Sequence, residues 1–228
     1  MLISSRTLAE YRAMFDLEDA NLAGSILDCA AGGSSFVAEL GDRRDTVATD
    51  PAYRQSSEEL AAVLRADRSQ CAQMTFDHDD EFVWDWYGCP ERRERFRVEA
   101  AERFLADRAA HPDRYVAAAL PDLPFADDSF DLVLCSHLLF TWAGVLDRRW
   151  HAAALAELVR VSRREVRLYP LVQRGAGDPV PYRDQLALGV RRAGHRWEER
   201  PVGFRFQRRA GVMAVITKGA AADRATAP

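Results

Sequence analysis

The chain has 228 residues, enough to bury one substantial hydrophobic core, and 48% of them are hydrophobic while 29% are charged. A formal net charge of -4 without a stripe of basic residues argues against a nucleic-acid-binding protein. The cysteines form no CxxC pair, and the N-terminus lacks a signal-peptide pattern. No apolar run reaches the roughly 18 residues of a membrane helix. We therefore expect a cytoplasmic protein without membrane or nucleic-acid partners.

The first predicted element is a short amphipathic helix within residues 5–15. Tyr11 and Met14 recur at helical spacing on its apolar face. Either Ser5 or Thr7 can cap the N-terminus of this helix, because both side chains can accept a hydrogen bond from the first turn.

The most informative segment is residues 25–36, which read SILDCAAGGSSF. An apolar run ends around Asp28, a loop of very small residues follows at 30–35, and a helix is expected over about 35–40 before Gly41 ends it. Because the loop carries little side-chain bulk, its backbone can turn tightly and approach a ligand closely. This pattern predicts a nucleotide-cradling turn, although a purely structural turn would use similar residues.

A second apolar run, residues 46–50 (TVATD), predicts the next strand and ends in Asp50. Asp50 follows Asp28 at about the 20-residue spacing at which Rossmann-like folds place a ribose-binding carboxylate. The alternative is that Asp50 caps the turn that begins at Pro51.

The middle of the chain predicts two helices, over 56–68 and 91–108, separated by an irregular, acidic and aromatic stretch at 74–88. The acidic residues at 77–81 are either a metal site or a solvated turn. We favour the turn and expect no metal, because consecutive residues do not converge readily on one ion.

The remaining elements alternate between strands and helices. Strands are predicted over 114–120, 131–135, 165–171, 196–206 and 211–218, with helices through Trp150, Ala154 and Leu158 and over 182–193. Such alternation predicts an α/β fold, a Rossmann-like three-layer sandwich whose mostly parallel seven-stranded sheet has an antiparallel edge strand. We expect a single domain over 1–218, with 1–24 an N-terminal helical segment, 70–112 a helical insertion and 219–228 a disordered tail.

At this point the chain resembles the class I S-adenosylmethionine-dependent methyltransferases. The resemblance is carried by ILDCAAGGSSF (26–36), VATDPAY (47–53), LPDLPFADDSFDLVLCSHLLF (120–140) and AELVRVSRREVRLYPL (156–171). The third segment is the most specific, with Phe125 under the expected fourth strand.

The resemblance implies S-adenosylmethionine as cofactor and a set of residues that bind it. These are Tyr11 as a lid residue, Asp28 as loop support, Ala30, Ala31 and Gly32 along the methionine part, Asp50 and Pro51 at the ribose, Ala119 and Leu120 beside adenine, and Ser136 near the reactive methyl group. Tyr11 could equally be a core contact.

Two positions depart from the family pattern. Family members commonly have glycine where this chain has Ala30 and Ser34, and an acid near Ala119 that is missing here. Ala30 fits the turn if its backbone angles are ordinary, and the adenine is left to backbone groups or to Asp122.

His137 is the candidate catalytic residue, because an imidazole can accept a proton from a substrate nucleophile near neutral pH. The alternative is a histidine that only packs against cofactor or backbone. The aromatic side chains near the expected site form a candidate substrate-binding set, made of Trp84, Trp86, Tyr87, Phe140 and Trp142. Trp84, Trp86 and Tyr87 could instead anchor the 91–108 helix.

Two further features leave alternatives open. Residues 174–181 are rich in glycine and proline and predict either a mobile loop over the site or a crossover connection. Cys29 and Cys135 end strands that should be neighbours. They are either a thiol pair or, more simply, two buried structural cysteines.

The sequence thus predicts a methyltransferase that acts on a small-molecule acceptor by in-line displacement, as a monomer or homodimer and in keeping with secondary metabolism. The alternatives are a non-methylating enzyme or a catalytically silent cofactor-binding subunit on the same fold. A nicotinamide dehydrogenase is disfavoured because G-x-G-x-x-G is absent from the loop.

Overall fold

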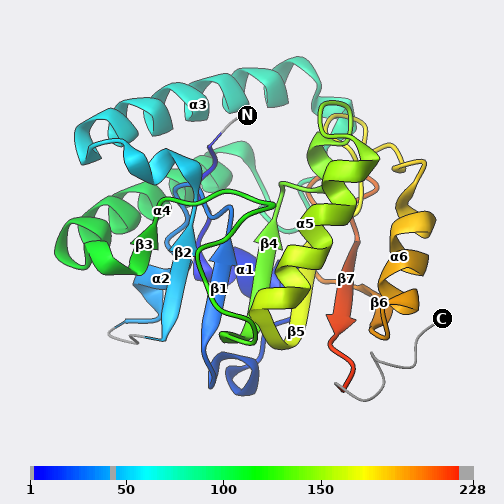
Figure 1. The fold of residues 1–228 in the computed structure, drawn as a ribbon. Helices are drawn as coiled ribbons and strands as arrows, with labels where there is room; N and C mark the ends of the chain where they lie inside the picture. The colour runs from blue at the N-terminus through cyan, green and yellow to red at the C-terminus, as the bar shows by residue number, and fades with distance from the viewer. Residues whose placement is uncertain (1–2, 42–44, 221–228) are drawn as a thin grey trace.

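The computed structural model describes residues 3–41 and 45–220, which fold around one sheet (Figure 1). The sheet has seven strands in the order β3-β2-β1-β4-β5-β7-β6. Their bounds are β1 Ile26–Cys29, β2 Thr46–Thr49, β3 Tyr115–Val116, β4 Phe130–Ser136, β5 Ser162–Tyr169, β6 Arg196–Pro201 and β7 Val212–Thr217. The predicted Rossmann-like fold is confirmed: neighbouring strands are parallel except where β7 lies antiparallel between β5 and the edge strand β6.

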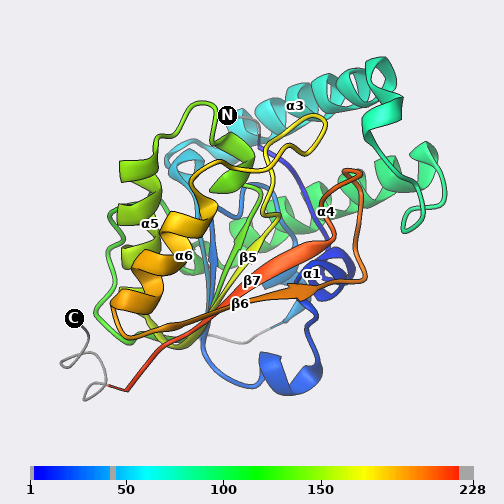
Figure 2. The ribbon, with the colours of Figure 1, turned by 90° about the vertical axis from the view of Figure 1, so that its right-hand side faces the viewer.

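Helices cover both faces of the sheet and one end of it (Figure 2). They are α1 Leu8–Phe15, α2 Phe36–Glu39, α3 Ser57–Asp77, α4 Pro90–Ala110, α5 Arg148–Val161 and α6 Arg183–Arg192. In Figure 2 α5 and α6 lie on one side of the strands, α1 and α4 lie on the other, and α3 crosses the upper end. None of the described helices combines the length and apolar character that a bilayer crossing needs.

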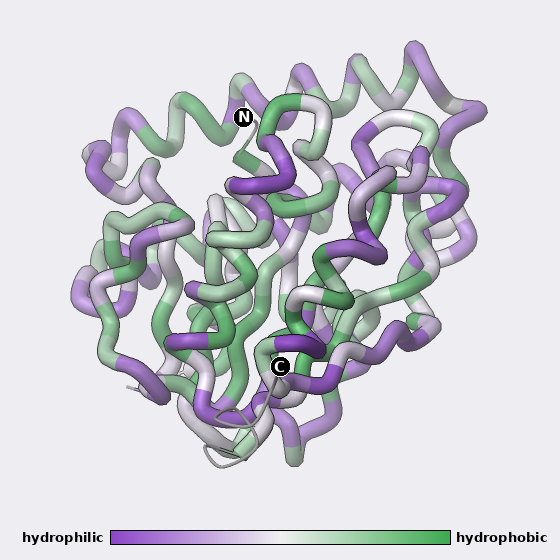
Figure 3. Tube along the Cα trace, turned by 45° about the vertical axis from the view of Figure 1, so that its right-hand side comes forward, coloured by the Kyte–Doolittle hydropathy of each residue, from purple (hydrophilic) through white to green (hydrophobic). Residues whose placement is uncertain are grey.

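The hydrophobic core is divided by the sheet into two clusters of buried side chains. One packs α1, α2 and α4 against the sheet around Phe15, Phe36 and Phe104, and the other packs α5 and α6 around Leu155 and Leu186. Figure 3 shows hydrophobic residues along the central strands and hydrophilic residues mainly in the outer helices and turns. Cys29 and Cys135 face each other in register as buried free cysteines, which favours the structural interpretation.

The largest differences from the sequence prediction are in three elements, one of which is the strand predicted over 196–206 that ends at Pro201. The stretch 74–77, expected to be irregular, continues α3, because no glycine or proline interrupts the helix after the Ser56 capping box. The third strand keeps only Tyr115–Val116 of the predicted 114–120, because the chain then leaves the sheet in a turn in which the Asp122 N–H donates to the Ala119 carbonyl at 3.1 Å. The residues at 221–228 of the predicted tail lie outside the described part.

A buried carboxylate ties the N-terminal segment to the helix α4. Glu10 of α1 is fully buried and accepts hydrogen bonds from Thr7 N at 2.8 Å, Arg97 Nη1 at 2.7 Å and the Tyr87 hydroxyl. Burial alone would raise the pKa of Glu10, but the positive charges of Arg97 and Arg6 hold it below its usual value of 4.5. Glu10 is therefore charged at neutral pH and stabilises the packing of α4 over the sheet.

We expect Glu10→Gln to lower the free energy of unfolding by about 3 kcal/mol at pH 7, because it leaves the Arg97 guanidinium buried without its counter-ion. Since the folded-state pKa of Glu10 is lowered, its contribution is present above about pH 4.5 and is lost as the pH falls through the folded-state value. Urea unfolding of wild type and variant from pH 7 down to pH 2 checks both statements.

The matched control is Glu99→Gln, which removes an exposed carboxylate of α4 that lies 4.0 Å from Arg103. It should change the stability by less than about 0.5 kcal/mol. A Glu10→Gln variant as stable as this control would contradict the role of the buried pair.

Candidate active site

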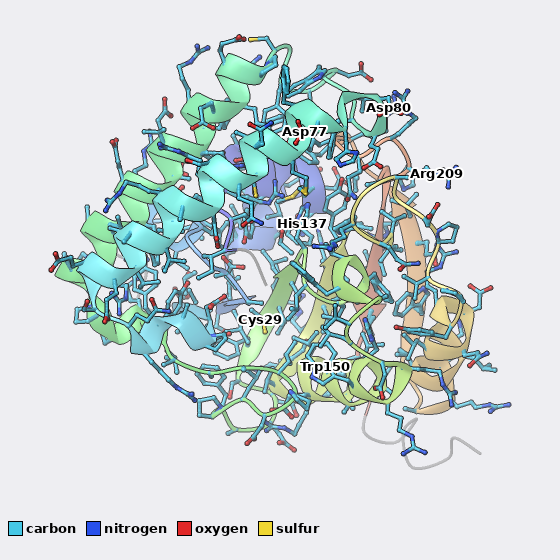
Figure 4. The ribbon with its side chains drawn as sticks, turned by 90° about the horizontal axis from the view of Figure 1, so that it is seen from above. Cys29, Asp77, Asp80, His137, Trp150 and Arg209 are labelled. Atoms are coloured by element: carbon cyan, nitrogen blue, oxygen red, sulfur yellow. The ribbon has the colours of Figure 1, made fainter. Side chains whose placement is uncertain are left out.

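A cavity of about 710 Å³ lies at the carboxyl ends of β1, β2 and β4. Its walls come from the residues before α1, the loop after β1, the turn after β2, the residues after β4, and the inner sides of α3 and α4. Figure 4 looks down on this end of the molecule and labels Cys29 and His137, which both line the cavity. This is the edge at which parallel α/β sheets bind their ligands.

The loop after β1 forms one end of the cavity and is tightly enclosed. Ala30, Ala31 and Gly32 line the cavity. Gly32 has a φ of +58°, and a Cβ there would come within 3.0 Å of the Ser4 carbonyl oxygen. Gly33 has no room either, since a Cβ would meet Leu64 Cδ2 at 2.5 Å. The glycines therefore let the loop pack closely against residues 3–5 and Leu64 of α3.

Ala30 also adopts a positive φ, of 58°, which corrects the expectation of ordinary backbone angles there. An alanine in the left-handed region is strained, because its Cβ approaches the carbonyl oxygen of the peptide. The position at which related proteins commonly have glycine thus keeps the conformation that glycine favours.

Asp50 lies directly beside this loop, at the end of β2. Its Oδ2 accepts a hydrogen bond from Gly32 N at 3.1 Å, and its Oδ1 accepts one from Ala52 N at 2.9 Å. Burial raises the pKa of Asp50, while these two backbone donors oppose the shift. Asp50 therefore caps the turn at Pro51–Arg54 and lines the cavity, and Pro51 lines it as well.

Asp28 and Tyr11 lie beneath the loop. The Tyr11 hydroxyl donates to Asp28 Oδ1 at 2.9 Å, and burial raises the pKa of Asp28 to about 8. Tyr11 is buried and its ring stacks on Phe36 at 4.7 Å, so the lid interpretation of Tyr11 is wrong and the core interpretation holds. The part of the N-terminal segment that lines the cavity is residues 3–6.

Ser136 and His137 follow β4 and face the same cavity. Ser136 Oγ lies 2.7 Å from His137 Nδ1, which leaves Nε2 as the ring atom that a ligand can meet. Burial, with smaller contributions from Arg6 and Arg97, holds the pKa of His137 well below 6.5. His137 is therefore neutral at pH 7, with Nε2 free of a proton or carrying it according to the tautomer, and its lowered pKa makes it a weaker base than a solvated imidazole.

The cavity wall formed by residues 118–120 is apolar. Ala119 and Leu120 line it together with Ala118, and no acidic side chain stands at the position where family members commonly have one. Asp122, the alternative partner for an adenine, is exposed and is not among the lining residues.

Most of the predicted aromatic substrate set is not in the cavity wall. Trp142 lines the cavity, but Trp84, Trp86, Tyr87 and Phe140 do not. Trp86 packs on Phe96 of α4 with ring centroids 5.4 Å apart, and Phe140 is buried against His151. The segment around Trp86 therefore anchors α4, which was the alternative interpretation.

The sequence analysis missed a group of arginines in the cavity wall, Arg6, Arg93 and Arg97. The signal in the sequence was the spacing of four residues between Arg93 and Arg97, which places both on one side of α4. Arg174 and Gly175 of the 174–181 segment also line the cavity, and the Arg174 Cζ lies 5.1 Å from the Trp142 ring centroid. In the described part of the chain, no group of His, Cys, Asp or Glu side chains could hold a metal ion.

A mostly parallel sheet with a small-residue loop and a carboxylate at its carboxyl edge is typical of Rossmann-like proteins, many of which bind nucleotide-type ligands. Residues 92–169 match the family described as a methyltransferase domain. This match spans the chain from α4 to β5 and agrees with the resemblance of the sequence to class I S-adenosylmethionine-dependent methyltransferases.

Other comparisons give distant similarities. An uncharacterized protein of Methanocaldococcus jannaschii is 27% identical over 174 residues, which cover 75% of this chain and 78% of that protein. Magnesium protoporphyrin IX methyltransferase from Synechocystis PCC 6803, with S-adenosylmethionine bound, is 13% identical at a TM-score of 0.47, over 93% of this chain and 76% of the other. A methyltransferase from Aquifex aeolicus is 15% identical at a TM-score of 0.45, over 91% and 92% of the two chains.

We expect Ala30→Gly to raise the free energy of unfolding by about 0.5–1 kcal/mol. The reason is that the strain energy removed from the folded state exceeds the entropic cost of ordering a more flexible glycine. Urea unfolding measures the change. Ala38→Gly, within α2 where no positive φ is required, serves as the control and should destabilise by about 1 kcal/mol. Equal losses in the two variants would contradict the strain at Ala30.

Proposed function

We propose that this chain transfers the methyl group of S-adenosylmethionine to a small-molecule acceptor. The observation that carries the proposal is the hydrogen bond between Gly32 N and Asp50, which joins the loop and the strand-end carboxylate at one end of a cavity that also exposes His137. A volume of about 710 Å³ lies within the range of small-molecule sites.

The residues fit this cofactor because the loop offers unobstructed backbone and the neighbouring wall is apolar. Asp50 would accept hydrogen bonds from the ribose hydroxyls beside Pro51, and Ala30, Ala31 and Gly32 would lie along the methionine part. Ala119 and Leu120 would border the adenine, and Asp28 would support the loop from below. S-adenosylmethionine supplies an electrophilic methyl group when bound.

Positioning is the main contribution of the protein in this proposal. Holding two reactants in a near-attack arrangement can remove about 7–11 kcal/mol of the barrier. His137 Nε2 would accept the proton of the acceptor nucleophile, and Ser136 would hold the imidazole through Nδ1. The neutral state of His137 at pH 7 supports this role.

A catalytically silent cofactor-binding subunit and a non-methylating enzyme are the alternatives on the same fold. Formation of S-adenosylhomocysteine with a panel of phenol, amine, thiol and carboxylate acceptors distinguishes them from a methyltransferase. In this proposal the protein acts in the cytoplasm as a monomer or homodimer.

We expect Asp50→Asn to weaken S-adenosylhomocysteine binding at least about tenfold, because charge-assisted hydrogen bonds contribute about 1.5–3 kcal/mol each. Isothermal titration calorimetry measures this, with Asp122→Asn as the control, since Asp122 is an exposed carboxylate at the same edge. Unchanged affinity in Asp50→Asn would refute the ribose role.

We expect His137→Gln to slow turnover by about 10²-fold or more while S-adenosylhomocysteine affinity changes little. Because the pKa of His137 is lowered, wild-type turnover should be constant above pH 7 and fall only below pH 6.5, and the variant should lack this fall. The measurement is S-adenosylhomocysteine release from pH 5 to 8 with an acceptor found in the panel. Full activity in His137→Gln would remove it as the base.

A further inference from the structure

The cavity wall contributed by the N-terminal segment and α4 carries an excess of positive charge. Arg6, Arg93 and Arg97 line it, and Glu10 is paired with Arg97 and Arg6. Arg97 Nη1 lies 2.7 Å from Glu10 Oε1 and Arg6 Nη1 lies 3.4 Å from it. Two other acids of α4 line the cavity, but Glu94 pairs with Arg68 at 2.9 Å and Glu102 is exposed, so Glu10 alone does not balance these guanidinium groups.

Arg93 is the uncompensated member of this group. In the part of the chain that the structure describes, Arg93 forms no ion pair and its buried Nε has no hydrogen-bond partner. Burial, followed by repulsion from Arg97 and Arg6, lowers the pKa of Arg93 to about 10, so the group stays charged at neutral pH. Arg6 is only 9% exposed, and its Nε also lacks a partner.

Position along α3 separates Arg93 from the cofactor loop. Leu64 of α3 packs on Gly33, whereas Cys71 of the same helix is the neighbour whose thiol interacts electrostatically with Arg93. With a rise of 1.5 Å per residue, these two points lie about 10 Å apart along the helix. Arg93 therefore faces the part of the cavity beyond the loop.

The walls around Arg93 are apolar and aromatic. Its Cζ lies 4.7 Å from the Phe206 ring centroid, and Phe206 stacks on Phe82 at 4.6 Å. Met74 and Val98 line the cavity from α3 and α4. An apolar body would be enclosed here, with only its charged group reaching the guanidinium.

We propose that the acceptor is an anion, an apolar molecule that carries a carboxylate or phosphate group bound by Arg93 together with Arg6. The proposal rests on the methyltransferase function above and names its substrate class. A planar guanidinium binds both oxyanions through paired hydrogen bonds, and the low-dielectric surroundings strengthen this attraction. A bound anion would also relieve the repulsion among the arginines.

The test uses benzoate and phenyl phosphate as probes, with benzyl alcohol as the neutral analogue, titrated by calorimetry into the protein saturated with S-adenosylhomocysteine. We expect at least one anion to bind more tightly than benzyl alcohol, and the tighter anion identifies the charged group. Arg93→Met should weaken that anion about tenfold or more, and Arg93→Lys should weaken it less.

Two controls make the result specific. Arg95→Met removes an exposed arginine of α4 that does not line the cavity and should leave anion affinity unchanged. Circular dichroism should show that Arg93→Met is folded, since Arg93 has no ion pair to lose.

Three outcomes would overturn the proposal: neither anion binds more tightly than benzyl alcohol, Arg93→Met binds the anion as wild type does, or Arg93→Met weakens S-adenosylhomocysteine as strongly as the anion. The last would assign the arginines to the carboxylate of the cofactor. If wild type does not bind S-adenosylhomocysteine, the proposed function fails, and the same titration of the ligand-free protein tests the anion site alone.

Discussion

The buried Glu10 carboxylate is the constraint on which the site depends. A buried charge is stable only when nearby groups compensate it. The Glu10 carboxylate accepts hydrogen bonds from Arg97 of α4, the Tyr87 hydroxyl and the Thr7 backbone N–H. Arg97 also donates to the Ser5 carbonyl at 2.5 Å, so the N-terminal segment and α4 are held together over the sheet. The interaction that closes the cavity therefore also gives it positive charge.

The second constraint is the shared edge of parallel strands. β1 pairs with both β2 and β4 in parallel register, so Cys29, Thr49 and Cys135 lie at the same level and the residues that follow them meet. Asp50 and His137 reach the cavity for this reason. The positive φ values of Ala30 and His137 are departures from relaxed backbone at this edge, where the chain must turn out of the sheet.

The sequence predicted the parts of the site that depend on local pattern. The small-residue loop and Asp50 were predicted because their chemistry is set by residue type and spacing, and the strands because their apolar runs are continuous. For Tyr11 and Trp86 the sequence left two interpretations open, because each packs on an aromatic partner distant in the sequence, Phe36 and Phe204, which a local pattern does not show. Arg93 was missed because charged residues with helical spacing are usually solvated, and only the fold shows that α3 covers this one.

The most direct measurement is the crystal structure of the protein with S-adenosylhomocysteine bound. The account predicts density for the ribose within hydrogen-bond distance of Asp50, the homocysteine part along residues 30–32, and the sulfur atom facing the space between His137 and Arg93. Density outside this cavity, or a bound nucleoside that does not touch Asp50, would contradict the account.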